Sequence, residues 1–450
     1  MRNVASLSVK EVLANQPTVE VSTLKNGFRV VAEENGRPTA TVGVWIETGS
    51  RYETETNNGV AHFLERLMHK GTEKRTSSAL ESELEKIGAR LKSYTSRDRT
   101  AVYIQSSSQD VDKVVDILAD VLRNSKLDSS AIEAERKVLL SELDEYEDNL
   151  QKMTMDNLHK AAVGFQYFPN LIHLSFEITA QHLKEWQEDN YRPVRMVLSA
   201  VGGGCSGSKM QGLAEKYFDD LSNEYPRKVP EAKGIRFTGS EYRYRNDYIP
   251  HMYAAVAVEG VGYGHKDALA LQMANQFIGQ WDVTHATTLT APSRWIQKIS
   301  HNYGLHYLEH FNLHYKDTGL FGVYFVSDGD HLDNSHTIMR AIQHEWKHLA
   351  GAVSEEETTL ARNQLRTALY GSLETNSEKA EHNALELLYT GNVRSLADIE
   401  EEISRIDRNR LKEVVFNQVY DRDTANVGVG LTEAYMSYPQ TRAAMSWWRL

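Results

Sequence analysis

The residues most able to do chemistry lie on a short, predicted helical segment around His62. There His62, Glu65 and Arg66 follow the pattern H-x-x-E-H, except that arginine replaces the second histidine. In the intact pattern, two histidines on one helical face bind zinc and the glutamate acts as a general base on a metal-bound water. Further along the chain, Glu142 lies on an acid-rich helical segment, with Glu135 two turns before it. A third, carboxylate ligand would have to come from that segment.

Arg66 removes one ligand from this pattern. A guanidinium stays protonated and offers only hydrogen-bond donors, so it cannot coordinate a cation. His69 cannot replace it, because seven helical residues separate it from His62 by about 10.5 Å, whereas two nitrogens on one zinc lie within about 4 Å. We expect Arg66 to supply the missing positive charge by pairing with Glu65 or Glu142, and its removal to be destabilising. The plainer alternative is an ordinary surface charge.

A second pattern, formed by His344, Glu345 and His348, matches the zincin signature H-E-x-x-H. The apolar face of the predicted helix carries Ile342 and Trp346, and His344 lies about 200° from Ile342 around the helix. His344 is therefore predicted to face solvent, and no third ligand is evident. We interpret this segment as a packing helix.

Other histidines and the single cysteine suggest no chemistry. His306, His310 and His314 alternate along a predicted strand without a cluster pattern, so we expect them to be exposed or hydrogen-bonded. Cys205 follows a buried strand in a glycine-rich stretch, which indicates a structural residue. One cysteine excludes an internal disulfide and fits a reducing compartment.

The composition narrows the possible partners. The 450 residues include 50 Lys and Arg against 62 Asp and Glu, a net charge of −12. Phosphate binding requires a basic face, so a nucleic-acid partner is disfavoured. The hydrophobic fraction of 41% is typical of a globular chain, and the longest apolar runs are too short to span a bilayer.

The chain repeats one order of elements. The first part predicts a meander of strands within 18–47 with a turn at Asn26-Gly27, helices at 59–70 and 77–87, a strand pair at 89–95 and 100–106, helices at 111–124 and 130–149, and a strand at 196–201. The second part predicts strands at 237–238 and 252–258, a helix at 266–279, a strand pair at 305–314 and 319–327, and helices at 336–350 and 354–372. Glu135–Leu143 also matches Ala361–Leu369. We therefore predict an α+β fold with an N-terminal extension (1–17), two homologous domains (18–224 and 235–450) and a linker (225–234).

At these residues the chain resembles the inverzincin peptidases of the mitochondrial processing peptidase type. This family includes the β subunit of that enzyme and core proteins of the cytochrome bc1 complex. The similarity runs over nearly the whole chain and is carried by Leu24–Val30, Thr41–Ile46, Gly49–Glu53, the His62 helix, Ser93–Arg97, Ile117–Asp120, Ile132–Arg136, Ile278–Asp282 and Met445–Leu450. It implies two domains in a clamshell arrangement, each a mostly antiparallel sheet packed with helices. It also places His62 at the first zinc ligand, Glu65 at the general base, Arg66 at the lost second ligand and Glu142 at the third.

Two segments depart from the family pattern. Residues 165–183 are shorter than the resemblance leads us to expect and lack a glycine-rich turn, which weakens the case for peptide binding. Residues 281–288 lack the glycine-rich loop of the processing peptidase α subunit, so the chain does not resemble that subunit.

Together, the resemblance and the lost ligand imply a non-catalytic structural core subunit of the mitochondrial respiratory bc1 complex, complex III. We expect no catalytic residue, bound metal or cofactor in this chain. The implied partners are a homologous core protein 2, cytochrome b, cytochrome c1 and other bc1 subunits. The implied location is peripheral, on the matrix side of the mitochondrial inner membrane, with membrane contact only through partners. The alternatives are an active β-type processing peptidase, a zinc metalloendopeptidase that cleaves presequences, and a zincin built on His344 and His348.

Overall fold

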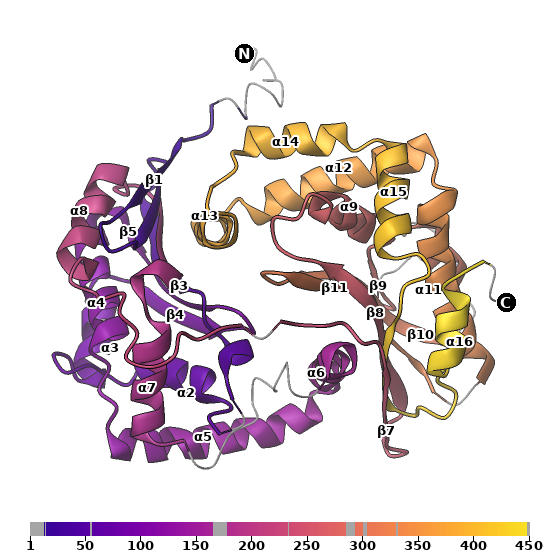
Figure 1. Cartoon of the computed structure of the whole chain (residues 1–450), viewed down its shortest axis with the longest axis horizontal. Coiled ribbons are helices and arrows are strands. Elements are labelled where there is room, and N and C mark those ends of the chain that lie inside the picture. Colours follow the sequence, from indigo (N-terminus) through magenta and orange to yellow (C-terminus); the bar gives the residue numbers. More distant parts are fainter. Residues whose placement is uncertain are drawn as a thin grey trace. The chain divides into compact units, whose positions relative to one another are not determined.

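The computed structural model describes residues 13, 15–54, 56–164, 178–232, 234–284, 293–299, 304–329 and 332–447. The chain forms two compact units, each built on one six-stranded sheet (Figure 1). The first unit comprises Met1–Glu142, Pro169–Lys233 and Tyr370–Glu400. The second comprises Leu143–Phe168, Gly234–Leu369 and Glu401–Leu450.

The first sheet has the strand order β1 (Val19–Thr23), β2 (Arg29–Glu34), β6 (Met196–Gly202), β3 (Thr39–Ile46), β5 (Thr100–Ser107) and β4 (Arg90–Thr95). Only β2 and β6 pair in parallel. The predicted turn at Asn26-Gly27 joins β1 to β2, and Gly27 has a φ of 84°, which favours glycine. The predicted meander is wrong beyond this hairpin, because β6 lies between β2 and β3. Apolar alternation locates strands but does not select their neighbours.

Helices cover both faces of this sheet (Figure 1). The helices that the first unit contains wholly or mainly are α2 (Val60–Met68), α3 (Ser77–Lys86), α4 (Val111–Arg123), α5 (Ser129–Asp148), α7 (Ala180–Asn190), α8 (Gly207–Phe218) and α13 (Asn376–Thr390). The main core lies between the sheet and the helices that include α2, α4 and α8, and it buries Phe28, Phe63 and Phe218. Helix α13 packs against β6 and β3. Helix α14 (Leu396–Arg405) follows it in the chain.

The second sheet has the order β7 (Glu241–Arg245), β12 (Ala425–Gly430), β8 (His251–Val261), β11 (Thr318–Asp328), β10 (Leu305–His314) and β9 (Gln280–Asp282). The helices of this unit are α6 (Leu150–Val163), α9 (Ala268–Ile278), α10 (Arg294–Ile299), α11 (Leu332–Gly351), α12 (Glu355–Ser372), α15 (Arg408–Gln418) and α16 (Tyr438–Ala444). The predicted strand at 237–238 is wrong, because the first strand of this sheet along the chain is β7, which begins at Glu241. Its sequence, Glu-Tyr-Arg-Tyr-Arg, lacks apolar alternation because an edge strand exposes much of its surface.

The two sheets share a topology. Strands β2-β6-β3-β5-β4 and β7-β12-β8-β11-β10 have the same order, and in each set only the first pair is parallel. The other pairs in both sets are antiparallel. The predicted α+β class, with two related and mostly antiparallel sheets, is confirmed.

One helix from each half of the sequence packs against the sheet formed mainly by the other half. Helix α6 packs against β12 and β8, where Leu158 and Ala162 are fully buried beside Ala255 and Val427. Helix α13, which occupies the corresponding place in the duplication, packs on the first sheet. The compact units therefore do not follow a single cut in the sequence.

Candidate functional site

Helix α2 carries the three residues of the incomplete zinc pattern. It begins after Gly59, whose φ is 87°. The carboxylate of Glu53 accepts hydrogen bonds from the backbone N–H groups of Gly59 and Ala61, at 2.8 and 3.0 Å. Burial raises the pKa of Glu53 to about 7, although both hydrogen bonds oppose this shift. These contacts, with the buried apolar face of α2, set the direction in which the helix presents His62 and Arg66.

The guanidinium of Arg66 lies between two carboxylates of α5. Its Nη2 donates to Glu142 Oε1 at 2.6 Å, and its Nε donates to Glu135 Oε1 at 3.0 Å. The ammonium of Lys70 contacts the other oxygen of Glu135 at 2.9 Å. The predicted pairing of Arg66 with Glu142 is therefore present, and the second partner of Arg66 is Glu135 rather than Glu65.

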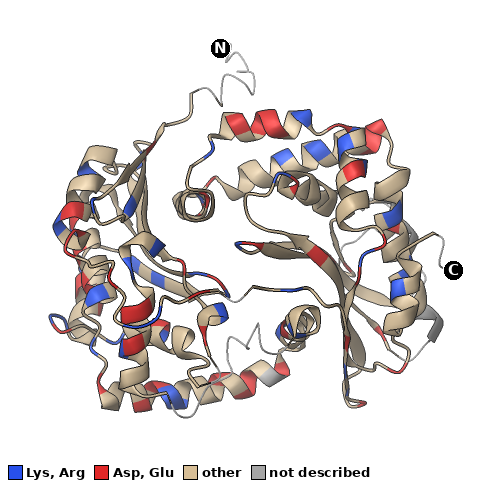
Figure 2. Ribbon diagram, viewed as in Figure 1, with Lys and Arg blue, Asp and Glu red and all other residues tan. Residues whose placement is uncertain are grey.

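Glu135 is a site residue that the sequence analysis did not assign to the pairing. It lies two helical turns from Glu142, so both side chains project from one face of α5, a helix rich in charged residues (Figure 2). That spacing is the signal that could have identified it. The side chain of Glu135 is only 3% exposed, whereas those of Arg66 and Glu142 are 36% and 37% exposed. Glu135 is thus the carboxylate that most needs a positive partner.

Glu65 belongs to a separate hydrogen-bond network. One of its oxygens lies 3.3 Å from His62 Nδ1, and the other accepts a hydrogen bond from Ser93 at 2.9 Å. The Ser93 hydroxyl also lies 2.7 Å from Nε2 of His69. Burial alone would raise the pKa of Glu65, but the hydrogen bonds from His62 and Ser93 hold it below its ordinary value. Glu65 is therefore a carboxylate already engaged by its neighbours.

The structure brings His62, Glu65, Arg66 and Glu142 together on α2 and α5. The two α5 carboxylates of the site contact the cationic side chains of Arg66 and Lys70. A zinc site with three protein ligands needs their ligand atoms to converge. Within the described ranges, one group of possible ligands converges in this way, and it lies in the second unit. The arrangement on α2 and α5 supports charge pairing between helices rather than activation of water.

The zincin-like pattern on α11 has the predicted orientation. Ile342 and Trp346 are buried, whereas His344 is exposed. His348 contacts a different helix, with its Nε2 3.1 Å from a carboxylate oxygen of Glu357 on α12. This geometry supports the interpretation of α11 as a packing helix.

His310 and His314 are hydrogen-bonded, as expected. His314 Nδ1 lies 2.9 Å from the carbonyl oxygen of Val261. His310 is buried, with its Nδ1 2.6 Å from the Asn275 side-chain oxygen and its Nε2 accepting from the Trp346 indole at 3.1 Å. Only a neutral imidazole satisfies both neighbours of His310, because Trp346 is itself a donor. Burial lowers the pKa of His310 to about 3.

We expect this histidine to destabilise the second unit in acid. Below about pH 6.5 the unfolded chain binds a proton at residue 310 that the folded chain does not bind, so the free energy of unfolding falls as the pH falls. The slope approaches about 1.4 kcal/mol per pH unit between the two pKa values. His310→Gln keeps a donor and an acceptor but cannot titrate. Urea unfolding of both proteins between pH 7 and 4 measures the difference, and parallel pH profiles would contradict the assignment.

Cys205 has no properties of a nucleophile. It is buried, and burial raises the pKa of its thiol to about 12.

Three segments singled out in the sequence lie largely outside the described residues. They are residues 165–177 of the segment predicted to be short, residues 285–288 of the segment predicted to lack a glycine-rich loop, and most of the predicted N-terminal extension. Among the described helices, none has the length and hydropathy of a membrane span.

Comparison with known proteins places the chain in a peptidase family. The model for insulinase, peptidase family M16, matches residues 29–172, and the model for the M16 inactive domain matches residues 177–365. The chain belongs to the M16 peptidase family.

Within this family, the chain is similar to both respiratory subunits and processing enzymes. It is 64% identical over 457 residues to mitochondrial cytochrome b-c1 complex subunit 1 of Caenorhabditis elegans. This alignment covers 100% of this chain and 96% of the relative. The rat subunit of the same name is 38% identical over 98% of this chain and 92% of its own length. The β subunit of the rat mitochondrial processing peptidase is 36% identical over 98% of this chain and 90% of its own length.

A solved structure supports the fold. A chain of complex III from Candida albicans, determined with Inz-5 bound, superposes with a TM-score of 0.81 at 21% identity. The match covers 95% of this chain and 100% of that chain.

Proposed function

We propose that this chain is a non-catalytic core subunit of the mitochondrial cytochrome bc1 complex, of the core protein 1 type. The similarity to a bc1 subunit, 64% identity over the full chain, exceeds the 36% identity to a processing peptidase β subunit. The role proposed is to support assembly and stability of the complex. Electron transfer would then belong to the cofactor-bearing subunits.

One observation carries the non-catalytic part of this proposal, namely the position of the Arg66 guanidinium between Glu135 and Glu142. A catalytic zinc keeps three protein ligands and one open position for water. Arginine cannot be one of these ligands, and its charge repels a cation. With the second ligand absent, Glu65 has no metal-bound water on which to act as a base.

The proposed partners are core protein 2, cytochrome b, cytochrome c1 and other bc1 subunits. The proposed location is the matrix side of the mitochondrial inner membrane, with membrane contact only through these partners. A subunit retained for its contacts needs a large permanent interface, typically more than about 2,000 Å². Native gel separation of mitochondrial complexes with mass spectrometry tests this assignment. We expect the chain to migrate with cytochrome b and cytochrome c1, and migration only with an α-type processing subunit would overturn it.

We also expect the His62 site to bind no zinc and the chain to cleave no presequence peptide. The measurement is zinc content after dialysis, with a peptide cleavage assay. Both use a His306→Ala background, because His306, His251 and Asp328 form the one converging group of possible ligands among the described residues. Arg66→His restores the pattern and is expected to gain zinc in the same background. Its peptide cleavage should stay poor, because residues 165–183 are shorter than expected for the family.

The active β-type peptidase is the alternative, since His62, Glu65 and Glu142 are all retained. Stoichiometric zinc in the His306→Ala protein with Arg66 intact, together with cleavage that a chelator abolishes, would establish the peptidase and refute the non-catalytic proposal.

A further inference from the structure

Three possible metal ligands meet at one end of the second sheet. His251 begins β8, His306 lies near the start of β10, and Asp328 ends β11. His306 Nε2 lies 2.7 Å from Asp328 Oδ1, and His251 Nδ1 lies 3.5 Å from the same oxygen. The two imidazole rings are 4.5 Å apart, and one ligand atom from each residue lies within 4.8 Å of the others.

The sheet itself brings the three side chains together. Asp328 is directly opposite His251 in the antiparallel pairing of β11 with β8, so their side chains share one face. On the other side of β11, the register with β10 shifts between Leu305 and Tyr307, and His306 is the unpaired residue of this irregularity. A β-bulge redirects a side chain. Here it directs His306 to the carboxylate of Asp328.

Two further features of the cluster are an unsatisfied ring nitrogen and close packing around the carboxylate. His251 Nδ1 is buried and has no hydrogen-bond partner among the described residues, and such an orphaned polar atom is costly. Gly304 has a φ of 56°, and a side chain there would collide with the Asp328 carboxylate. All three ligand side chains are between 36% and 41% exposed, so the cluster borders solvent.

We infer that His251, His306 and Asp328 form a binding site for a divalent transition metal ion of the zinc class. Two imidazole nitrogens and one carboxylate oxygen are the ligand set of an open zinc site, with water in the fourth position. Imidazole ligands favour zinc and its neighbours over magnesium or calcium. On binding, the metal takes the place of the hydrogen bond between His306 and Asp328, and His306 ligates through Nε2 with its proton on Nδ1.

This site is separate from the incomplete pattern on α2. It lies in the second unit and draws its ligands from three adjacent strands, β8, β11 and β10. A metal bound there links these strands and stabilises the folded state by an amount that rises with the logarithm of its free concentration over its dissociation constant. The inference does not depend on assembly into the bc1 complex.

The test uses the full chain, freed of metal by dialysis against a chelator, and zinc ions as the probe. Competition with a chromogenic chelator gives stoichiometry and affinity, and the absorption spectrum of added cobalt reports coordination. We expect one zinc per chain. His251→Ala and His306→Ala each remove a ligand and should weaken binding at least about 100-fold, because loss of a group that merely orients a ligand already costs 10- to 100-fold.

The matched control is His344→Ala, which removes an exposed histidine of the same unit and also tests the zincin pattern. It should bind zinc as the unchanged chain does. The rise in melting temperature on adding zinc should persist in His344→Ala and disappear in His306→Ala, whose melting temperature without metal shows that it folds. The inference is overturned if the unchanged chain binds no zinc, or if the cluster variants bind it with unchanged affinity.

Discussion

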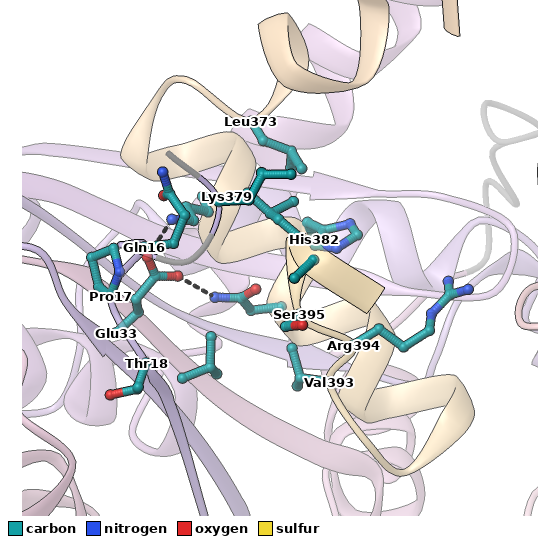
Figure 3. A pocket seen from close by; sticks show the side chains of 15 residues that line it. Gln16, Pro17, Thr18, Glu33, Leu373, Lys379, His382, Val393, Arg394 and Ser395 are labelled. Atoms are coloured by element: carbon teal, nitrogen blue, oxygen red, sulfur yellow. Dashed lines mark hydrogen bonds and ion pairs between the residues drawn. The ribbon is translucent and has the colours of Figure 1, made fainter. Parts of the chain in front are cut away.

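Lys379→Ala is expected to lower the free energy of unfolding of the first unit by about 3–5 kcal/mol, the cost of leaving a buried charge without its partner. Glu33 on β2 is fully buried, and its carboxylate contacts Lys379 and Asn383 of α13 (Figure 3). The pair borders a cavity of about 410 Å³. Lys379 is 15% exposed and Glu33 is 0% exposed, so the variant leaves the less hydrated of the two charges unpaired.

Two controls separate this effect from a general loss of charge. Lys209→Ala removes a lysine from a surface pair with Asp112, in which the side chains are 34% and 60% exposed, and should cost less than about 1 kcal/mol. Replacing both buried partners, with Lys379→Met and Glu33→Gln, should recover much of the loss, because no buried charge is left unpaired and the amide oxygen at position 33 can still accept the hydrogen bond from Asn383. Urea unfolding measures all three proteins. A loss from Lys379→Ala no larger than that from Lys209→Ala would contradict the argument.

The second large effect is expected from Arg66→Ala combined with Lys70→Ala. Together these substitutions remove both cations that contact Glu135, which is 3% exposed. We expect a loss of about 3–5 kcal/mol. Arg66→Ala alone should cost about 1–2 kcal/mol, since Lys70 still neutralises Glu135 and the pair with Glu142 is more than a third exposed. The loss from the double variant should therefore exceed the sum of the single losses.

The matched control repeats this cycle with Glu135→Gln. Without the buried carboxylate, the losses from Arg66→Ala and Lys70→Ala should add. Additivity in the presence of Glu135 as well would show that the two cations act independently and would refute their shared role. The cycle also tests how the helices are joined. Arg66 on α2 and Lys70, two residues beyond the end of α2, both contact Glu135 on α5.

The energetic weight of Arg66 depends on burial, and burial depends on packing. The sequence identified Arg66 as the charge that replaces a ligand, and it identified the helical segment that carries the carboxylate partner Glu142. It could not show that Arg66 stays 36% exposed or that Glu135 is the buried member of the group. Spacing along α5 places Glu135 and Glu142 on one face, but the depth of each residue depends on what packs around the helix.

The sequence by itself determined the α+β class, the duplication and the positions of most helices and strands, because apolar periodicity is a local property. It also determined that the His62 pattern lacks a ligand, since the chemistry of arginine does not depend on its surroundings. Only the tertiary structure placed β6 between β2 and β3. Only it packed α6 on the second sheet and α13 on the first. Only it brought His251, His306 and Asp328 together, through strand register and one irregularity in β10. These contacts join residues far apart in the chain, and no local pattern specifies which distant surfaces pair.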